Sequence, residues 1–174
     1  MTTTMIVARL SLAVLVLALL AACSAQESPP PKPRVVKRDL LVEIRSQAEA
    51  LASNVQVEPL ADPEVDDLRA RARTEEMQGK YEVAAATIKQ AMSLRPEDPT
   101  LIQWAAELAL VRGRHDEAER GAQRSYDLGP KLGEICVRNW LTIKEARAAR
   151  SDAQGATSAA AQLPACQVQA PVRM

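Results

Sequence analysis

A period of 34 residues in the middle of the chain constrains its fold more than any other feature. When the sequence is shifted by 34 positions against itself, six residues meet an identical or similar partner. The matched pairs are Gly79 and Gly113, Tyr81 and His115, Ala84 and Ala118, Ala91 and Ser125, Leu94 and Leu128, and Pro96 and Pro130. The same step from Pro130 reaches Pro164. A repeat of this length predicts similar supersecondary units stacked around one shared core.

The recurring residues indicate helices joined by tight turns. Gly79 and Gly113 stand where a first helix ends and the chain reverses, a position that favours a residue able to adopt positive φ. Asp98-Pro99 places an N-cap carboxylate before a proline at the first helical position, and Asp62-Pro63 repeats this arrangement. Both dipeptides therefore predict helix starts.

The composition favours the same fold class. The chain contains no Phe, two Trp and two Tyr, so its apolar residues are mainly Ala, Leu, Val and Ile. Alanine-rich segments favour helices, whereas strands favour β-branched and aromatic residues. We therefore predict an all-α fold of antiparallel helix hairpins.

This helix–turn–helix unit of 34 residues resembles the tetratricopeptide repeat, with one repeat at 63–96 and a second at 99–130. The helix positions where that family carries Trp, Leu-Gly and Tyr hold other residues here. They are Leu68, Arg71-Ala72 and Glu75 in the first repeat and Ile102, Ala105-Ala106 and Ala109 in the second. The resemblance implies a solenoid of about two clear repeats plus capping helices; the alternative is a generic pair of helical hairpins with a coincidental period.

The flanking segments are expected to complete the core, because two such repeats alone do not bury a continuous face. Residues 38–53 carry apolar side chains at helical spacing and predict an N-terminal packing helix. These side chains are Leu41, Ile44, Ala48 and Leu51. Residues 133–150, with Cys136, Trp140 and Ile143 on one face, predict a third first-type helix, and the Ala-rich residues 153–163 predict its closing partner. This last unit lacks the turn glycine.

The first 22 residues are expected to be an export signal. An apolar run from Leu10 to Leu20 is too short to span a bilayer, which takes about 20 residues, but it fits the core of a signal peptide. The junction Leu20-Ala21-Ala22-Cys23 resembles the bacterial lipobox, which implies cleavage before Cys23 and acylation of its sulfur, with palmitate among the expected chains. The alternative is an ordinary cleavable signal in which Cys23 stands by chance. Ser24 after the cysteine favours the outer membrane by resemblance to the enteric sorting rule.

Residues 23–37 are expected to form a tether between the lipid and the helical domain. Four of the five residues 29–33 are proline, which fixes φ and removes an amide donor, so this stretch is neither helix nor central strand. Extended chain of this kind covers about 3.1 Å per residue. Its cationic side chains either contact anionic headgroups or are simply solvated; they are Lys32, Arg34, Lys37 and Arg38. The helical domain then occupies 38–166 and a flexible tail 167–174.

Two of the three cysteines are expected to form a disulfide. Lipidation of Cys23 leaves Cys136 and Cys166, and export brings both to an oxidising compartment. In an antiparallel helical hairpin the start of the first helix lies close to the end of the second. A bond between Cys136 and Cys166 would therefore hold the last hairpin closed.

The tetratricopeptide resemblance implies a groove lined by the first helix of each repeat and suited to a peptide or a partner helix. The family's groove positions fall on Asp66, Arg69, Arg73, Glu76 and Met77 in the first repeat, and on Thr100, Gln103, Glu107, Leu110 and Val111 in the second. Partner contacts are expected at Arg69, Arg73, Met77, Gln103, Glu107 and Leu110. Arg69 and Arg73 lie four residues apart and either hold a carboxylate together or belong to a solvated charge stripe with Glu76 and Glu107.

The sequence carries no pattern typical of catalysis, metal binding or nucleic-acid binding. His115 is the single histidine and aligns with Tyr81 at the turn, no Cys or His cluster has metal-ligand spacing, and no Gly-rich phosphate loop is present. Acidic pairs such as Glu75-Glu76 are expected at the solvated surface. Lys+Arg and Asp+Glu balance at 22 each, so no net field recruits nucleic acid. We expect no enzyme and no cofactor apart from the covalent lipid.

These observations predict a lipid-anchored adaptor at the periplasmic face of the bacterial outer membrane. Its expected partner is another envelope protein or peptide, held by the groove in envelope assembly or secretion. The alternative is a structural accessory subunit of a larger envelope complex, without a free peptide groove. The adaptor predicts a well-behaved monomer, whereas the accessory subunit predicts self-association when isolated.

Overall fold

The computed structural model describes residues 38–51 and 62–167. The expected signal peptide, Cys23, the proline-rich tether and residues 168–174 lie outside the described residues. The chain divides into two units at Lys37, and the second, Arg38–Met174, contains every described element.

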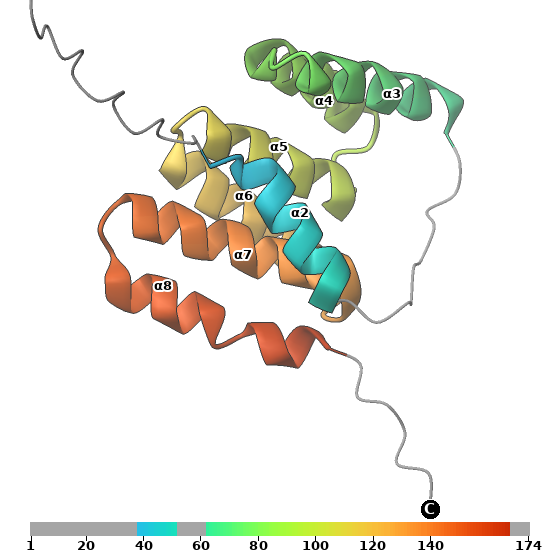
Figure 1. The fold of residues 1–174 in the computed structure, drawn as a ribbon. Coiled ribbons are helices and arrows are strands. Elements are labelled where there is room, and N and C mark those ends of the chain that lie inside the picture. Colours follow the sequence, from blue (N-terminus) through green and yellow to red (C-terminus); the bar gives the residue numbers. More distant parts are fainter. Residues whose placement is uncertain (1–37, 52–61, 168–174) are drawn as a thin grey trace, which may run out of the picture. The chain divides into compact units, whose positions relative to one another are not determined.

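The described residues are helical and contain no strand, so the all-α prediction is confirmed (Figure 1). The helices are α2 (Leu40–Leu51), α3 (Pro63–Met77), α4 (Tyr81–Leu94), α5 (Pro99–Val111), α6 (His115–Leu128), α7 (Gly133–Ala149) and α8 (Ala153–Ala160), followed by the 3-10 turn η1 (Leu163–Cys166). Consecutive helices pair as the hairpins α3–α4, α5–α6 and α7–α8. The hairpins then stack through α4 on α5 and α6 on α7.

The predicted helix starts depend on capping carboxylates. The side chain of Asp62 accepts a hydrogen bond from the backbone N–H of Val65, and that of Asp98 accepts from Thr100 and Leu101. In each case proline occupies the first helical position, where the missing N–H removes no intrahelical bond. Local chemistry alone therefore places the starts of α3 and α5.

The turn inside each hairpin requires one residue with positive φ. Gly79 and Gly113 have φ of 70° and 76°, as their place in the repeat predicts. The third hairpin uses Ser151, with φ of 64°, at the equivalent position two residues after the end of α7. Helix α7 has 17 residues where α5 has 13, so this turn falls four residues beyond the period of 34. Shifting the sequence by 34 residues from Gly113 therefore does not reach Ser151.

The core lies between the helices of each hairpin and is built largely from small side chains. Ala84 and Ala118, the equivalent alanines of α4 and α6, are both fully buried. A cluster of buried residues from α3, α4 and α5 includes Ile88 and Leu108, and a second cluster links α5 and α6 to α7. Alanine at these positions lets neighbouring helices approach closely, which suits the aromatic-poor composition.

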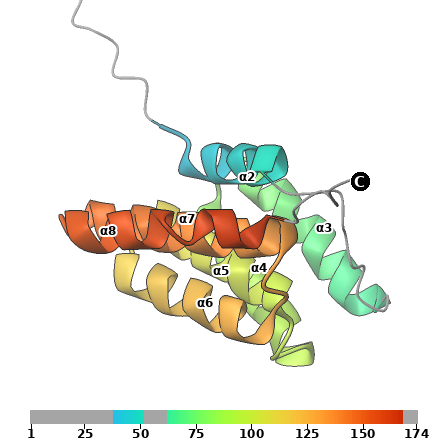
Figure 2. The same ribbon diagram turned by 90° about the horizontal axis from the view of Figure 1, so that it is seen from below.

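Helix α2 does not pack on the next helix along the chain. It lies on α7 and, to a smaller extent, on α5 (Figure 1). The view from below shows α7 between α2 and α6 (Figure 2). Leu41 of α2 joins the cluster of the first hairpin, whereas Ile44 and Ala48 join the cluster around α7. Helix α2 therefore covers the side of α5 and α7 on which the resemblance places a groove.

Candidate interaction site

Helix α2 occupies the predicted groove with three apolar side chains on one face. Leu41, Ile44 and Ala48 are 3%, 2% and 0% exposed. Their spacing of i, i+3 and i+7 is that of an amphipathic helix bound in a groove. The chain therefore supplies its own helix to the face where an external partner was expected.

A buried carboxylate beneath α2 joins three helices. Glu107 of α5 is fully buried, and Arg138 of α7 binds both of its oxygens at 2.7 and 2.8 Å. Arg45 of α2 contacts the same carboxylate at 2.9 Å. Gln103, also fully buried, donates to Glu107 at 3.1 Å and to the Thr142 hydroxyl at 2.8 Å. We call Arg45, Glu107 and Arg138, together with Glu76 of α3, which also pairs with Arg45, the charge cluster.

The charges of this cluster oppose the effect of burial on its pKa values. Burial by itself raises the pKa of the Glu107 carboxyl. The guanidinium groups of Arg138 and Arg45 lower this pKa by more than burial raises it, so the pKa is below the ordinary value of 4.5. Burial by itself lowers the pKa of Arg138, and Glu107 reverses that shift. Glu107 is therefore a carboxylate at neutral pH.

Arg45 also binds Glu76 of α3, which in turn contacts Trp104 of α5, so the charge cluster extends from α5 to α3. The guanidinium of Arg45 forms a two-pronged ion pair with Glu76, in which one nitrogen–oxygen distance is 3.1 Å. Trp104 Nε1 donates to Glu76 at 2.7 Å. The guanidinium carbons of Arg45 and Arg73 lie 5.8 and 5.7 Å from the centre of the Trp104 ring. Both distances are within cation–π range.

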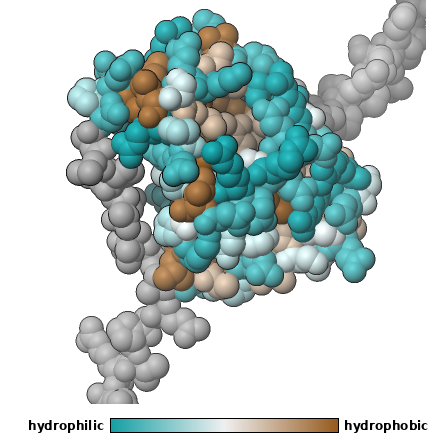
Figure 3. Space-filling view, turned by 180° about the vertical axis from the view of Figure 1, so that it is seen from behind, coloured by the Kyte–Doolittle hydropathy of each residue, from teal (hydrophilic) through white to brown (hydrophobic). Residues whose placement is uncertain are grey.

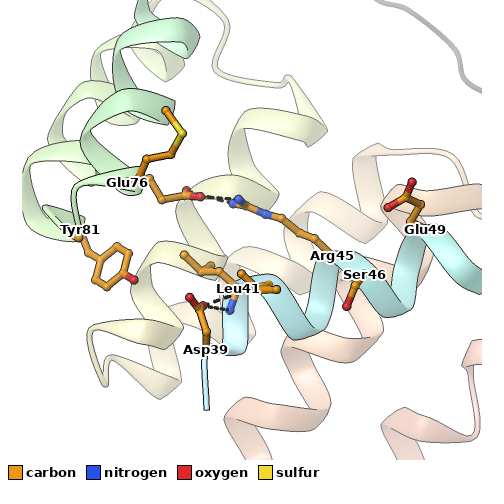
Figure 4. A pocket seen from close by; sticks show the side chains of 10 residues that line it. Asp39, Leu41, Arg45, Ser46, Glu49, Glu76 and Tyr81 are labelled. Carbon is orange, nitrogen blue, oxygen red and sulfur yellow. Dashed lines mark hydrogen bonds and ion pairs between the residues drawn. The ribbon is translucent and has the colours of Figure 1, made fainter. Parts of the chain in front are cut away.

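A cleft of about 490 Å³ opens between α2 and the end of α3 (Figure 4). One wall carries Asp39, Leu41 and Arg45, and the other carries Glu76, Met77 and Tyr81. We call this hollow the α2–α3 cleft. Met77 on its rim is 76% exposed, and Val42 on the α2 side is 63% exposed. The cleft therefore combines large exposed apolar side chains with charged groups, which is typical of protein interaction surfaces.

The face opposite the view of Figure 1 offers a different surface. Hydrophilic side chains cover most of it, and hydrophobic ones form small, separate patches (Figure 3). Scattered apolar residues of this kind are normal on a soluble domain. The α2–α3 cleft is the better candidate for an interaction site.

The structure corrects the expected groove in part. Gln103 and Glu107 are 0% exposed and Leu110 is 2% exposed, so these residues do not line an open groove. The reason is that α2 and α7 pack over them. Arg69 donates to Asp98 at 2.9 Å and to the Thr100 hydroxyl at 2.6 Å, so it anchors the start of α5.

Arg73 and Met77 of α3 remain exposed, and Met77 lines the α2–α3 cleft. Arg73 is exposed beside Trp104, and within residues 38–51 and 62–167 no acidic side chain forms an ion pair with it. The predicted joint carboxylate site of Arg69 and Arg73 is therefore reduced to Arg73. The expectation for Glu76 is also wrong, because its carboxylate accepts from Trp104 and Arg45 instead of facing solvent.

The structure joins Cys136 to Cys166 in a disulfide with a Cα–Cα distance of 5.5 Å. Cys136 is near the start of α7, and Cys166 ends η1, so the bond ties η1 to the start of α7. Both residues are almost fully buried. Cys23 lies outside the described residues.

Sequence reasoning missed Arg45 and Arg138 as members of the site. Arg45 follows the apolar anchor Ile44, and Arg138 follows the buried Val137. A charged residue next to the apolar stripe of a helix is a signal for a buried ion pair. Residue type alone, however, assigns arginine to the surface, and the acidic partner is distant in sequence.

The remaining expectations on chemistry concern metals and membranes. Within residues 38–51 and 62–167 no group of three His, Cys, Asp or Glu side chains is placed to hold a metal ion. Among the same residues, no helix is both long and apolar enough to cross a membrane.

Acid is expected to weaken the docking of α2. A carboxyl group with a lowered folded-state pKa contributes stability above its ordinary pKa of 4.5 and loses it as the pH falls through the folded-state value. The contribution of Glu107 should therefore be constant from neutral pH to about pH 5.5 and decrease below 4.5. Urea unfolding followed by circular dichroism at pH 7, 5, 4 and 3 measures this. A Glu107→Gln variant with the same acid-dependent loss would contradict it.

Comparisons with known proteins support the fold. No protein-family model matches the chain, and no curated protein matches it. A solved structure of the globular C-terminal domain of P. aeruginosa LpoP matches with a TM-score of 0.57 and 24% sequence identity. The match covers 60% of this chain and 98% of that domain. The two chains therefore share a helical fold.

Proposed function

We propose that this protein is a lipid-anchored adaptor at the periplasmic face of the bacterial outer membrane, where it holds another envelope protein. The lipobox-like Leu20-Ala21-Ala22-Cys23 and the proline-rich segment after it support an anchor and a tether. Stacked helical hairpins, here interpreted as tetratricopeptide units, are a binding scaffold with no chemistry of their own. The lipid on Cys23 is the only group the proposal adds to the chain.

The α2–α3 cleft carries this proposal. Met77 and Val42 expose large apolar side chains at its edges. Arg73 lies about one helical turn before Met77 on α3 and contacts the ring of Trp104. Trp and Arg are the residue types that contribute most to protein interfaces, particularly when apolar neighbours exclude water around them. Arg73, which has no acidic partner among the described residues, fits an acidic group on the bound protein.

In-cell photo-crosslinking tests the proposal. A photoreactive residue at Met77 or Val42 should form one dominant adduct with an envelope protein, identified by mass spectrometry. In a bacterial envelope the candidate classes are cell-wall enzymes, pilus components and secretion components. Gln103 is unsuitable for the probe because it is fully buried. Arg73→Glu should reduce the adduct at least about tenfold, because a buried charge-assisted contact contributes about 1.5–3 kcal/mol.

Two matched variants complete the test. Arg71→Glu makes the same charge change on the same helix, but it lies about 200° around the helix from Arg73 and should leave the adduct intact. Cys23→Ala removes the acyl site and should move the protein from the membrane to the soluble fraction. An adduct that survives Arg73→Glu, or one lost equally in Arg71→Glu, would remove the cleft from the proposal.

The occupied groove also supports the second candidate, a structural accessory subunit with no free peptide groove. That function predicts self-association of the isolated domain, whereas the adaptor predicts a monomer. Size exclusion with light scattering on residues 37–174 separates the two. A stable oligomer that hides Met77 from crosslinking would favour the accessory subunit.

A further inference from the structure

The way in which α2 binds its own domain defines the chemistry of the groove beneath it. Helix α2 places Leu41, Ile44 and Ala48 against α5 and α7 and the first hairpin, and its next residue after Ile44, Arg45, reaches two carboxylates. The face is therefore built for a helix with apolar residues at i, i+3 and i+7 and an arginine at i+4.

Without a bound helix, the groove lacks both an apolar cover and a cation for its carboxylates. Without α2, the cluster around Leu110, Val137 and Leu141 would lose the apolar cover of Ile44 and Ala48. Glu76 would lose Arg45, the residue with which it forms its ion pair. Glu107 would lose Arg45 and keep its ion pair with Arg138 and the hydrogen bond from Gln103. An empty groove is therefore unfavourable in free energy. Its apolar floor would be exposed to water, and its carboxylates would lose the guanidinium of Arg45.

Helix α2 is also separate from the repeats that form the groove. It precedes the first hairpin in sequence but packs mainly on α7, which begins 82 residues after α2 ends, counting from Leu51 to Gly133. Its buried face consists of Leu41, Ile44 and Ala48, and the rest of the helix is partly or fully exposed. Such an element resembles a tethered ligand more than a layer of the solenoid.

We propose that α2 is an exchangeable occupant of this groove, and that the adaptor's partner binds by inserting an amphipathic helix of the same pattern in its place. The proposal rests on the proposed function, but it moves the contact from the α2 wall of the α2–α3 cleft to the groove beneath α2. The partner segment has apolar residues at i, i+3 and i+7, with arginine at i+4 to pair with Glu76 and Glu107. The intramolecular helix has the advantage of its high effective concentration, so the groove stays closed until a partner helix competes.

A labelled peptide tests the exchange. The probe is a fluorescent peptide of residues 38–51, RDLLVEIRSQAEAL, measured by anisotropy against the full mature chain. Ile44→Asp places a charge at the centre of the buried face of α2 and should release it, so this variant should bind the peptide at least about tenfold more tightly than the wild type. Ala50→Asp adds the same charge at an exposed position of α2 that does not line the α2–α3 cleft, and should behave as the wild type. A peptide with Arg45→Glu should bind neither protein.

Further outcomes decide against the proposal. A folded Ile44→Asp protein that does not bind the peptide would overturn the proposal. An Ile44-dependent dimer of the wild type would also overturn it, because a second copy of the chain would then be the occupant. If Ile44→Asp does not fold, hydrogen exchange on the wild type decides instead. We expect α2 amides to exchange at least about tenfold faster than those of α5, and equal protection would overturn the proposal. Crosslinking at Met77 that persists without peptide exchange would leave the adaptor function intact.

Discussion

Replacing Glu107 with glutamine is expected to lower the free energy of unfolding by about 3–5 kcal/mol. The carboxylate is fully buried and pairs with Arg138 through both oxygens and with Arg45 through one. The amide keeps the shape but removes the negative charge, so Arg138 keeps only its longer ion pair with Glu134, at 3.3 Å. Urea unfolding at pH 7, followed by circular dichroism, measures the loss.

Two comparisons separate this effect from a general loss of charge. Glu134→Gln removes the other carboxylate near Arg138, but that side chain is 39% exposed, so its loss should cost at most about 0.5 kcal/mol. A Glu107→Met and Arg138→Met double variant removes both buried charges and should recover most of the stability. Equal losses from Glu107→Gln and Glu134→Gln would mean that burial of the carboxylate does not matter.

Removal of the Cys136–Cys166 disulfide is expected to lower the free energy of unfolding by about 3.6 kcal/mol. The bond closes a loop with a sequence separation of 30, which restricts the unfolded chain. It also secures a weak end of the domain, because α8 has eight residues and helices this short are marginal without tertiary support. Urea unfolding of a Cys136→Ala and Cys166→Ala double variant measures the loss.

Single variants and chemical labelling provide the controls for this prediction. Cys136→Ala and Cys166→Ala should each destabilise the domain about as much as the double variant, because either change removes the same bond. Thiol alkylation should label Cys136 and Cys166 only after reduction. Unchanged stability after reduction would show that the bond does not support the fold.

The α-helical class and most helix boundaries could be predicted because local chemistry determines them. The cap at Asp98 and the positive φ at Gly113 depend on a few neighbouring residues, and the structure shows both. The turn between α7 and α8 is the exception, and its reason is also local. Ser151 makes a turn with positive φ without being glycine, and a longer α7 moves it out of the repeat's register.

The candidate site was less predictable. Arg73 and Met77 were expected as contacts of a groove lined by the first helix of each repeat, and both are exposed. Gln103, Glu107 and Leu110 share the predicted helix face but are covered by α2 and α7. The groove positions follow from helical periodicity, whereas their exposure depends on which other segment binds to them.

The order of the helices, the glycine turns and the pair of cysteines available for a disulfide therefore follow from the sequence. The packing of α2 mainly on α7, and the buried carboxylate that Arg45 and Arg138 share, become visible only in three dimensions. The two groups of features differ in the range of the interactions that produce them. Caps and turns depend on residues within one helical turn, whereas the docking of α2 depends on side chains contributed by separate helices far apart along the chain.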